Sequence, residues 1–252
     1  MILIFCGIIG IILGGNSSSA EKSYKITYKK EIIEEFIKLV SAEIEYKTSS
    51  FDTDVIVGNY KRANFDSKIF NKFDIDDYIV GKLEDNVYVE ISDLNIQKKE
   101  IYYHKGRRKE TIIEIFKGIF SKTECDKDIG TYIKISKNKL KVFEQYNRVE
   151  MDSQEFEKYF DIYSENKILT MQLLTSDVMA TLIDFYNKYN IDYEIVIRNN
   201  KIYMRFFTGA MFEPKIFGNS MDKELLLKYY CILKFIVDVT KEVNKALKEV
   251  EI

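Results

Sequence analysis

The distribution of charge divides this chain into two unequal parts. Residues 1–15 carry no charged side chain, whereas the sequence after Glu21 is charged along its whole length. An apolar run of this kind suits a membrane, and the charged remainder is typical of a water-exposed globular domain. We therefore divide the chain into a hydrophobic anchor or signal-like segment at 1–20 and a domain at 21–252, which can be split into sub-regions 21–148 and 149–252.

Two interpretations of the apolar segment compete, because it is shorter than the ~20 residues of a bilayer-spanning helix. Ser18 and Ala20 place small residues where a signal peptidase reads, which favours cleavage before Glu21 and export. Against cleavage, no Lys or Arg precedes the apolar core. Lipidation of Cys6 is disfavoured, because the preceding Phe5 is too large for a lipobox.

Positive charge after the segment favours an uncleaved anchor. Basic flanks of a membrane segment tend to stay in the cytoplasm. The lysines concerned are Lys22, Lys25, Lys29 and Lys30. We expect residues 1–15 to hold the chain at the membrane, with the domain in the cytoplasm.

Both helical and strand periodicities occur in the domain, and they do not alternate as βαβ units. Apolar residues at helical spacing predict an amphipathic helix over 29–44, and Val87, Val89 and Ile91 alternate as in a strand. This mixture predicts an α+β fold with a largely antiparallel sheet and flanking helices, preceded by an N-terminal membrane helix.

Three hairpins are predicted from polar turns between apolar runs. The first joins 101–103 to 111–120 through a loop at 104–109, and the second joins 132–135 to 140–143. The third, from Ile191 to Phe207, turns at Asn199-Asn200 and has the strictest alternation.

Helix start signals are clearest in the second half of the chain. Asp152 with Glu155 resembles a capping box for a helix over 153–160, and Thr175 is placed to cap the next helix. A last helix is predicted from Asn219 or Ser220, with acidic residues in its first turn and Lys245 and Lys248 near its end, as the helix dipole favours.

Five segments of the chain resemble one known family. The longest, at 149–179, reads VEMDSQEFEKYFDIYSENKILTMQLLTSDVM and is similar to the signature block of a bacterial, membrane-anchored family, domain of unknown function three-one-three-seven, sometimes mislabelled galanin. Four others follow the family's order: FDSKIF from Phe65, VGKLEDNVYVEISDL from Val80, FKGIF from Phe116 and MFEP from Met211.

The resemblance implies one or two membrane spans ahead of the domain and supplies no catalytic residues. The chain departs from the family pattern in two places. It starts inside what would be the last span, and Ser176 stands where Pro often follows the LLT motif.

We find no catalytic or cofactor motif, and we predict no catalytic, cofactor-binding or metal-binding residues. The single histidine, His104, excludes sites with several histidine ligands. Cys125 and Cys231 belong to no CxxC motif. In a cytoplasmic domain they are expected to be free thiols, with Cys231 buried in the last helix, whereas in an exported domain they could pair. A faint calcium-loop spacing lacks the required Gly and closing Glu, so we interpret it as a solvated turn. Its residues are Asp74, Asp76 and Asp77.

Two short segments have a structural and a functional interpretation. In FKGIF, the aromatic residues are expected in the core, and Gly118 allows a bulge or close packing. The basic loop at 104–109 is either a solvated hairpin tip or a contact with anionic lipid or a partner protein. The candidate contact residues are Lys105, Arg107, Arg108 and Lys109.

The sequence favours a membrane-tethered, non-catalytic interaction or scaffolding module. One alternative is an enzyme, and another is an exported soluble protein after cleavage near Ala20. Carboxylates occur on any solvated surface, so they give the enzyme little support. They are Glu84, Asp85, Glu155 and Asp161. The near balance of 38 Lys and Arg against 40 Asp and Glu argues against a nucleic-acid partner.

Overall fold

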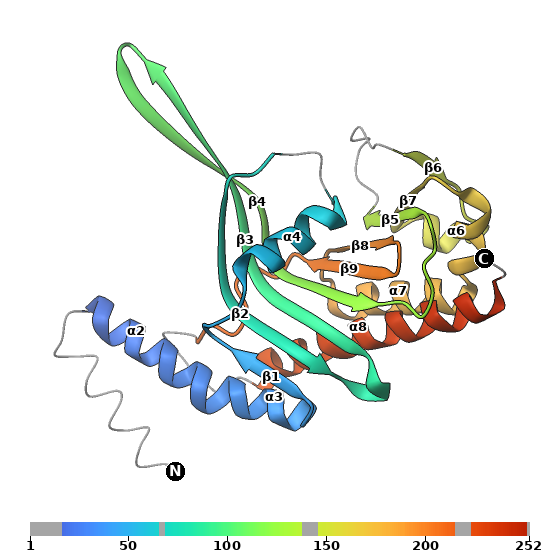
Figure 1. Cartoon of the computed structure of the whole chain (residues 1–252), viewed down its shortest axis with the longest axis horizontal. Coiled ribbons are helices and arrows are strands. Elements are labelled where there is room, and N and C mark those ends of the chain that lie inside the picture. Colours follow the sequence, from blue (N-terminus) through green and yellow to red (C-terminus); the bar gives the residue numbers. More distant parts are fainter. Residues whose placement is uncertain (1–16, 66–68, 138–145, 215–222, 251–252) are drawn as a thin grey trace.

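The computed structural model describes residues 17–65, 69–137, 146–214 and 223–250. Within them, nine strands form one sheet in the order β1-β2-β3-β4-β9-β8-β5-β7-β6, with helices on its faces (Figure 1). All neighbouring strands are antiparallel. The predicted α+β fold with an antiparallel sheet and flanking helices is therefore confirmed.

The strands of this sheet differ greatly in length, and the two in its first half, β3 and β4, are the longest. Their bounds are β1 (Ile44–Lys47), β2 (Lys72–Lys82), β3 (Tyr88–His104), β4 (Arg107–Glu124), β5 (Tyr132–Lys137), β6 (Asn147–Val149), β7 (Phe160–Ser164), β8 (Tyr193–Arg198) and β9 (Lys201–Phe206).

The helical segments lie before, between and after the strands. They are α2 (Ser17–Tyr28), η1 (Lys29–Ile33), α3 (Glu34–Val40), α4 (Thr53–Ala63), η2 (Glu84–Asn86), α5 (Gln154–Glu157), α6 (Lys167–Leu173), α7 (Ser176–Tyr189) and α8 (Lys223–Glu249).

The first three helical segments form one continuous helix. The backbone remains α-helical at Tyr28 and Ile33, where the α-helix becomes the π-helical turn η1 and then α-helix again. The prediction of a helix over 29–44 is wrong at both ends, because the helix already contains Ser17 and because the chain becomes extended at Ser41. Ile44 then belongs to β1, which its apolar side chain also suits.

The predicted anchor at residues 1–15 lies outside the described residues. In the described part of the chain, no single helix is long and apolar enough to cross a bilayer. Helices α6 and α7 taken together have the length and composition of a membrane span, but the angle between them at the break is 71°.

The β8–β9 hairpin and the Thr175 cap are confirmed. The Tyr193 to Arg198 strand pairs with β9 across Asn199-Asn200, and Oγ1 of Thr175 accepts a hydrogen bond from the N–H of Val178. Lys245 and Lys248 lie near the end of α8, as predicted, while the predicted start of that helix at 219 or 220 is outside the described residues.

Of two predictions for the middle of the chain, one lies outside the described residues and one is wrong. The strand predicted at 140–143 is outside the described residues, and both edges of β5 are paired, with β7 and with β8. The helix predicted over 153–160 is the single turn α5, capped by Ser153 rather than Asp152, and Phe160 begins β7. Aromatic side chains that fit a helix face fit a buried strand equally well, which is why short apolar runs are ambiguous.

The two faces of the sheet carry separate cores. On one face, the first helix and α6, α7 and α8 pack on the inward side chains of the strands, with Ile33, Leu182, Ile195 and Ile236 fully buried. On the other face, α4 packs over an aromatic cluster (Figure 1). The cluster includes Tyr60, Phe65, Phe116, Phe120 and Tyr203.

Gly118 lies where β4 passes β9 most closely. Its φ is +149°, and a Cβ there would lie 2.0 Å from the carbonyl oxygen of Phe206. Phe116 and Phe120 are buried in the α4 cluster and Ile119 on the opposite face. The FKGIF segment is therefore core, with a glycine required for close packing, as predicted.

Candidate functional site

A buried charged cluster joins the first helix to the sheet. The π-helical turn η1 adds a residue to the local helical repeat and places Lys29 on the face toward the sheet, where its side chain is only 6% exposed. A lysine at such a position needs partners, because an uncompensated buried charge is strongly destabilising. The partners are three carboxylates from two separate parts of the chain.

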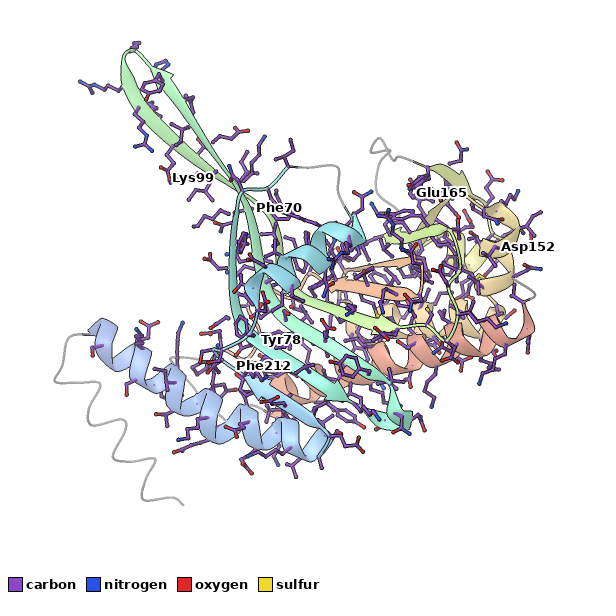
Figure 2. All side chains as sticks on the ribbon, viewed as in Figure 1. Phe70, Tyr78, Lys99, Asp152, Glu165 and Phe212 are labelled. Atoms are coloured by element: carbon purple, nitrogen blue, oxygen red, sulfur yellow. The ribbon has the colours of Figure 1, made fainter. Side chains whose placement is uncertain are left out.

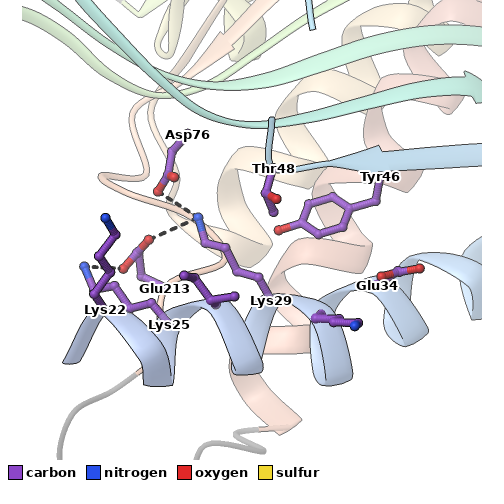
Figure 3. Close-up of a pocket in the computed structure, with 10 residues that line it drawn as sticks. Lys22, Lys25, Lys29, Glu34, Tyr46, Thr48, Asp76 and Glu213 are labelled. Carbon is purple, nitrogen blue, oxygen red and sulfur yellow. Dashed lines mark ion pairs between the residues drawn. The ribbon is translucent and has the colours of Figure 1, made fainter. Parts of the chain in front are cut away.

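Nζ of Lys29 reaches three carboxylates. It lies 2.8 Å from Asp77 Oδ2, 2.7 Å from Asp76 Oδ2 and 3.3 Å from Glu213 Oε1. Glu213 also pairs with Lys25 at 2.8 Å. Figure 3 shows Asp76 and Glu213 converging on Lys29 from the strand side and from the segment after β9.

A β-bulge produces this arrangement of aspartates. On β2, Asp76 and Asp77 together oppose the single residue Asp93 of β3, because the register shifts between Ile75 and Tyr78. A bulge redirects side chains, and here it turns Asp77 into the interior. The three residues predicted as a solvated turn are thus part of a strand, and Asp77 is buried rather than solvated.

Two buried carboxylates, those of Asp77 and Asp93, accept a hydrogen bond from a donor other than lysine. The hydroxyl of Tyr46 on β1 donates a 2.5 Å hydrogen bond to Asp77 Oδ1. The backbone N–H of Met211 donates a 2.7 Å hydrogen bond to Asp93 Oδ2. Sheet, first helix and the segment after β9 are therefore tied together through polar contacts.

The pKa values of Asp77, Asp93 and Lys29 are all raised in the cluster. Burial raises the pKa of Asp77 to about 6, although the charge of Lys29 opposes the rise. Burial also raises the pKa of Asp93 to about 8, with a further rise from Asp77. For Lys29, burial disfavours the charged form, but the carboxylates of Asp77 and Asp76 outweigh it and raise its pKa. The cluster therefore holds protons that ordinary aspartates would lose.

A pocket of about 620 Å³ opens beside the cluster, between the first helix and the β1–β2 edge. Four lysines and three carboxylates line it together with Tyr46, Thr48 and Ile26. The charges nearly balance, and Lys25 and Lys29 are engaged by carboxylates, so the pocket has no strong preference for an anion or a cation. Among the described residues, no group of three or more His, Cys, Asp or Glu side chains is placed to hold a metal ion.

The second candidate site is a projecting hairpin. Beyond its last pair with β2, at Gln97, β3 continues only against β4 and the two strands leave the sheet as a ribbon (Figure 1). Another bulge lies at its base, where Ile115 is the extra residue between the Ile96–Phe116 and Gln97–Glu114 pairs. We call residues 101–110 the β-arm, and all ten are exposed.

The base of the ribbon is held by Asn71. Its side-chain oxygen accepts from the N–H of Lys99 at 2.7 Å, and its amide donates to the carbonyl oxygen of Lys99 at 2.9 Å. Lys99 marks this position in Figure 2, beyond which side chains point into solvent on both faces of the ribbon. A two-stranded ribbon without a third strand or a packed face is only marginally stable by itself.

The predicted contact residues all lie at the end of the β-arm, but in a tighter turn than expected. The turn is only Lys105-Gly106, with φ of 51° and 72°, as in a type I′ hairpin. Arg107, Arg108 and Lys109 therefore belong to β4, and His104 to β3, opposite Arg107.

The two carboxylates at the base of the β-arm are each paired with a lysine. Glu100 pairs with Lys98 at 2.6 Å, and Glu110 pairs with Lys99 at 2.7 Å. No ion pair is found in the described structure for the four cations of the tip. Glu100 and Glu110 therefore offset the positive charge of the tip only slightly.

The carboxylates of the enzyme hypothesis do not meet in one cleft. Glu84 and Asp85 lie in η2 and pair with lysines of α8, Glu155 is exposed on α5, and Asp161 on β7 bonds to Arg148 at 2.6 Å. Both cysteines of the domain are free thiols. Cys231 is half-buried rather than buried, because it lies at the margin of the face that α8 packs on the sheet.

The buried cluster was missed from the sequence. Lys29 and its neighbours were interpreted only as the positive flank of an anchor, and Asp76-Asp77 only as polar surface. The one local signal is the segment FDIDDYIV from Phe73, in which strand alternation continues on either side of two adjacent aspartates. Such an interrupted alternation is the pattern of a bulge.

Comparison with known proteins agrees with the family resemblance. The family model described as "Protein of unknown function (DUF3137)" matches residues 114–245. Among solved structures, the chain is similar to the crystal structure of the mycobacterial trehalose monomycolate transport factor A, TtfA, with a TM-score of 0.49 and 9% identity over 87% of this chain and 93% of that chain. No curated protein gives a significant match.

Proposed function

Since the chain belongs to the DUF3137 family of proteins of unknown function, we propose that it is a membrane-tethered, non-catalytic interaction module with its domain in the cytoplasm. The observation that carries the proposal is the β-arm, which is exposed on both faces and carries cations without ion pairs in the described structure. A marginally stable ribbon of this kind adds little to the stability of the domain. It is suited to contacts outside the domain.

The proposal of a tether is supported by the uncharged residues 1–15 and by the lysines that follow them. The first helix is described from Ser17 onward and is fixed to the sheet by the Lys29 cluster. The helix that follows the proposed tether in the sequence is thereby held on the domain.

Membrane fractionation tests the tether. The full chain is expected to sediment with membranes, to resist extraction by high salt and to be released by detergent, whereas a variant lacking residues 1–16 becomes soluble. In intact spheroplasts the domain is expected to be protected from added protease. A mature chain beginning at Glu21, or a domain digested in spheroplasts, supports export and overturns the cytoplasmic placement.

Site-specific cross-linking tests the role of the β-arm. A photo-reactive residue in place of Tyr103, which is 74% exposed on the arm, is expected to give cross-links in native membranes. Tyr88, 41% exposed at the start of the same strand but far from the arm, is the matched control. Equal yields at both positions, or none at Tyr103, would count against an interaction module that acts through the arm.

A further inference from the structure

We infer that the tip of the β-arm binds the anionic lipid headgroups of the membrane to which the chain is tethered. The inference rests on the proposed tether and names the partner of the arm. The first observation is the composition of the tip, where the four cations lie next to aromatic and aliphatic side chains that are unusually exposed. These are Ile101 and Tyr102, each 48% exposed, and Tyr103, 74% exposed.

The register places a tyrosine beside a cation on each face of the ribbon. Tyr102 pairs with Lys109, and Tyr103 pairs with Arg108. Because paired residues share a face and successive residues alternate, the two pairs lie on opposite faces. A protein partner would contact one face, whereas a ribbon entering a headgroup layer tip first is surrounded on both. The two-sided pattern therefore favours lipid.

The side-chain types suit the boundary between headgroups and acyl chains. Tyrosine has an apolar ring with a polar end, and Lys and Arg have apolar stems that can lie along the ring while their charges reach phosphate. Cations near an anionic leaflet are attracted to its surface potential, and that potential is negative on the cytoplasmic side. The charge sign thus agrees with the proposed cytoplasmic domain.

The direction of the arm is compatible with contact at the same membrane. In Figure 1 the tip of the β-arm lies at the upper left and the first turn of α2 at the lower left, while α6, α7 and most of the sheet lie to the right. One plane along the left side, seen edge-on in this view, can meet both. Residues 1–15 directly precede α2 in the sequence.

The absence of tryptophan from this chain permits a direct test in the full-length protein. Tyr103→Trp introduces the only indole, at the arm tip, and the variant is reconstituted into vesicles of phosphatidylcholine alone or with phosphatidylglycerol. In the anionic vesicles we expect its emission to shift to shorter wavelength and to be quenched by lipids brominated near the headgroup. In neutral vesicles, and for the control Tyr88→Trp in either vesicle, neither effect is expected.

Charge reversal in the Tyr103→Trp background tests the cations. Arg107→Glu, Arg108→Glu and Lys109→Glu together are expected to abolish the shift and to reduce quenching to the neutral-vesicle level. The matched control reverses three exposed lysines far from the arm, one at the C-cap of α5 and one each on α6 and α7, and should keep the full signal. They are Lys158, Lys167 and Lys188. At ~1 M salt, where the Debye length is only ~3 Å, the signal should vanish while the chain stays with the vesicles.

The outcomes separate this inference from the proposed function. A chain that floats with vesicles but shows no shift in anionic lipid retains its tether and refutes lipid binding by the arm. An equal shift in neutral vesicles also refutes it, because the cations would then have no role. A chain that fails to float with any vesicle refutes the tether itself. Circular dichroism of each variant, unchanged from the parent, shows that the fold is intact.

Discussion

The Nζ atom of Lys29 lies 2.8 Å from Oδ2 of Asp77, and both side chains are almost completely shielded from solvent. The two residues are 48 positions apart, one on the first helix and one in the bulge of β2. Desolvating such a pair costs several kcal/mol for each charge, so its net contribution depends on every partner being present. Tyr46 and Asp76 supply those partners here. The contact consequently fixes the helix that emerges from the apolar segment.

Lys29→Met is expected to destabilise the domain by ~3–5 kcal/mol, because it leaves the buried Asp77 carboxylate without its cation. Adding Asp77→Asn should recover much of the loss, since an amide costs far less to bury than a charge. Urea unfolding of the full chain in detergent measures both. The exposed neighbour Lys30 serves as control, and Lys30→Met should change the stability by less than ~0.5 kcal/mol. A double variant no more stable than Lys29→Met would contradict the pairing.

The pKa of Asp93 predicts that stability falls as pH rises. A carboxyl with a higher pKa in the folded than in the unfolded state binds more protons when folded, so the free energy of unfolding decreases with pH between the two values. For Asp93 this window runs from 3.8 to about 8, and for Asp77 from 3.8 to about 6. One such proton gives a slope of up to ~1.4 kcal/mol per pH unit.

Asp93→Asn should therefore flatten the dependence between pH 7 and 8, where Asp77 is already mostly ionised. The amide oxygen can still accept the hydrogen bond from Met211. Unfolding by urea at closely spaced pH values compares the variant with the parent chain. Parallel curves for the two proteins above pH 7 would show that Asp93 does not titrate in this window.

Gly118→Ala is expected to cost more than ~3 kcal/mol, because the new Cβ would collide with backbone at Phe206 and because alanine rarely adopts φ of +149°. Gly106 separates the two causes. Its φ is also positive, at +72°, but nothing lies within 4 Å of a Cβ there, so Gly106→Ala should cost only ~1–2 kcal/mol. Thermal unfolding of both variants measures the difference. Equal shifts in Tm would show that the close approach of β4 and β9 is unimportant.

Local patterns predicted those parts of the fold whose partners are close in sequence. The β8–β9 hairpin has strict alternation around Asn199-Asn200. Thr175 caps a helix by accepting a hydrogen bond from the N–H of Val178, three residues later. In both cases a short stretch of sequence contains the whole signal. The full length of β3 could not be predicted from the sequence, because its polar second half, around Lys98 and Lys99, has the composition of a loop. Only pairing with β4 makes it a strand.

Contacts between distant residues could not be predicted in this way. The two edges of β5 are paired with β7 and β8, and this depends on how the whole sheet is ordered. Burial of Lys29 depends on a bulge and on Glu213, which lie far along the chain. The basic tip was identified because charge is visible in a sequence, but its projection from the sheet is a property of the fold alone.

Excision of the β-arm should leave the domain folded. Glu100 and Thr111 are register partners, four pairs removed from the pair His104 and Arg107 that closes the natural turn, so they have the same hydrogen-bonding phase. Replacing residues 101–110 by Asn-Gly therefore restores a type I′ turn and keeps the contacts of Asn71 with Lys99. Because all the deleted residues are exposed, Tm should change by only a few degrees, ~1 kcal/mol or less. The same variant should lose the cross-links and the lipid signal assigned to the arm, and a large fall in Tm would show instead that the arm stabilises the sheet.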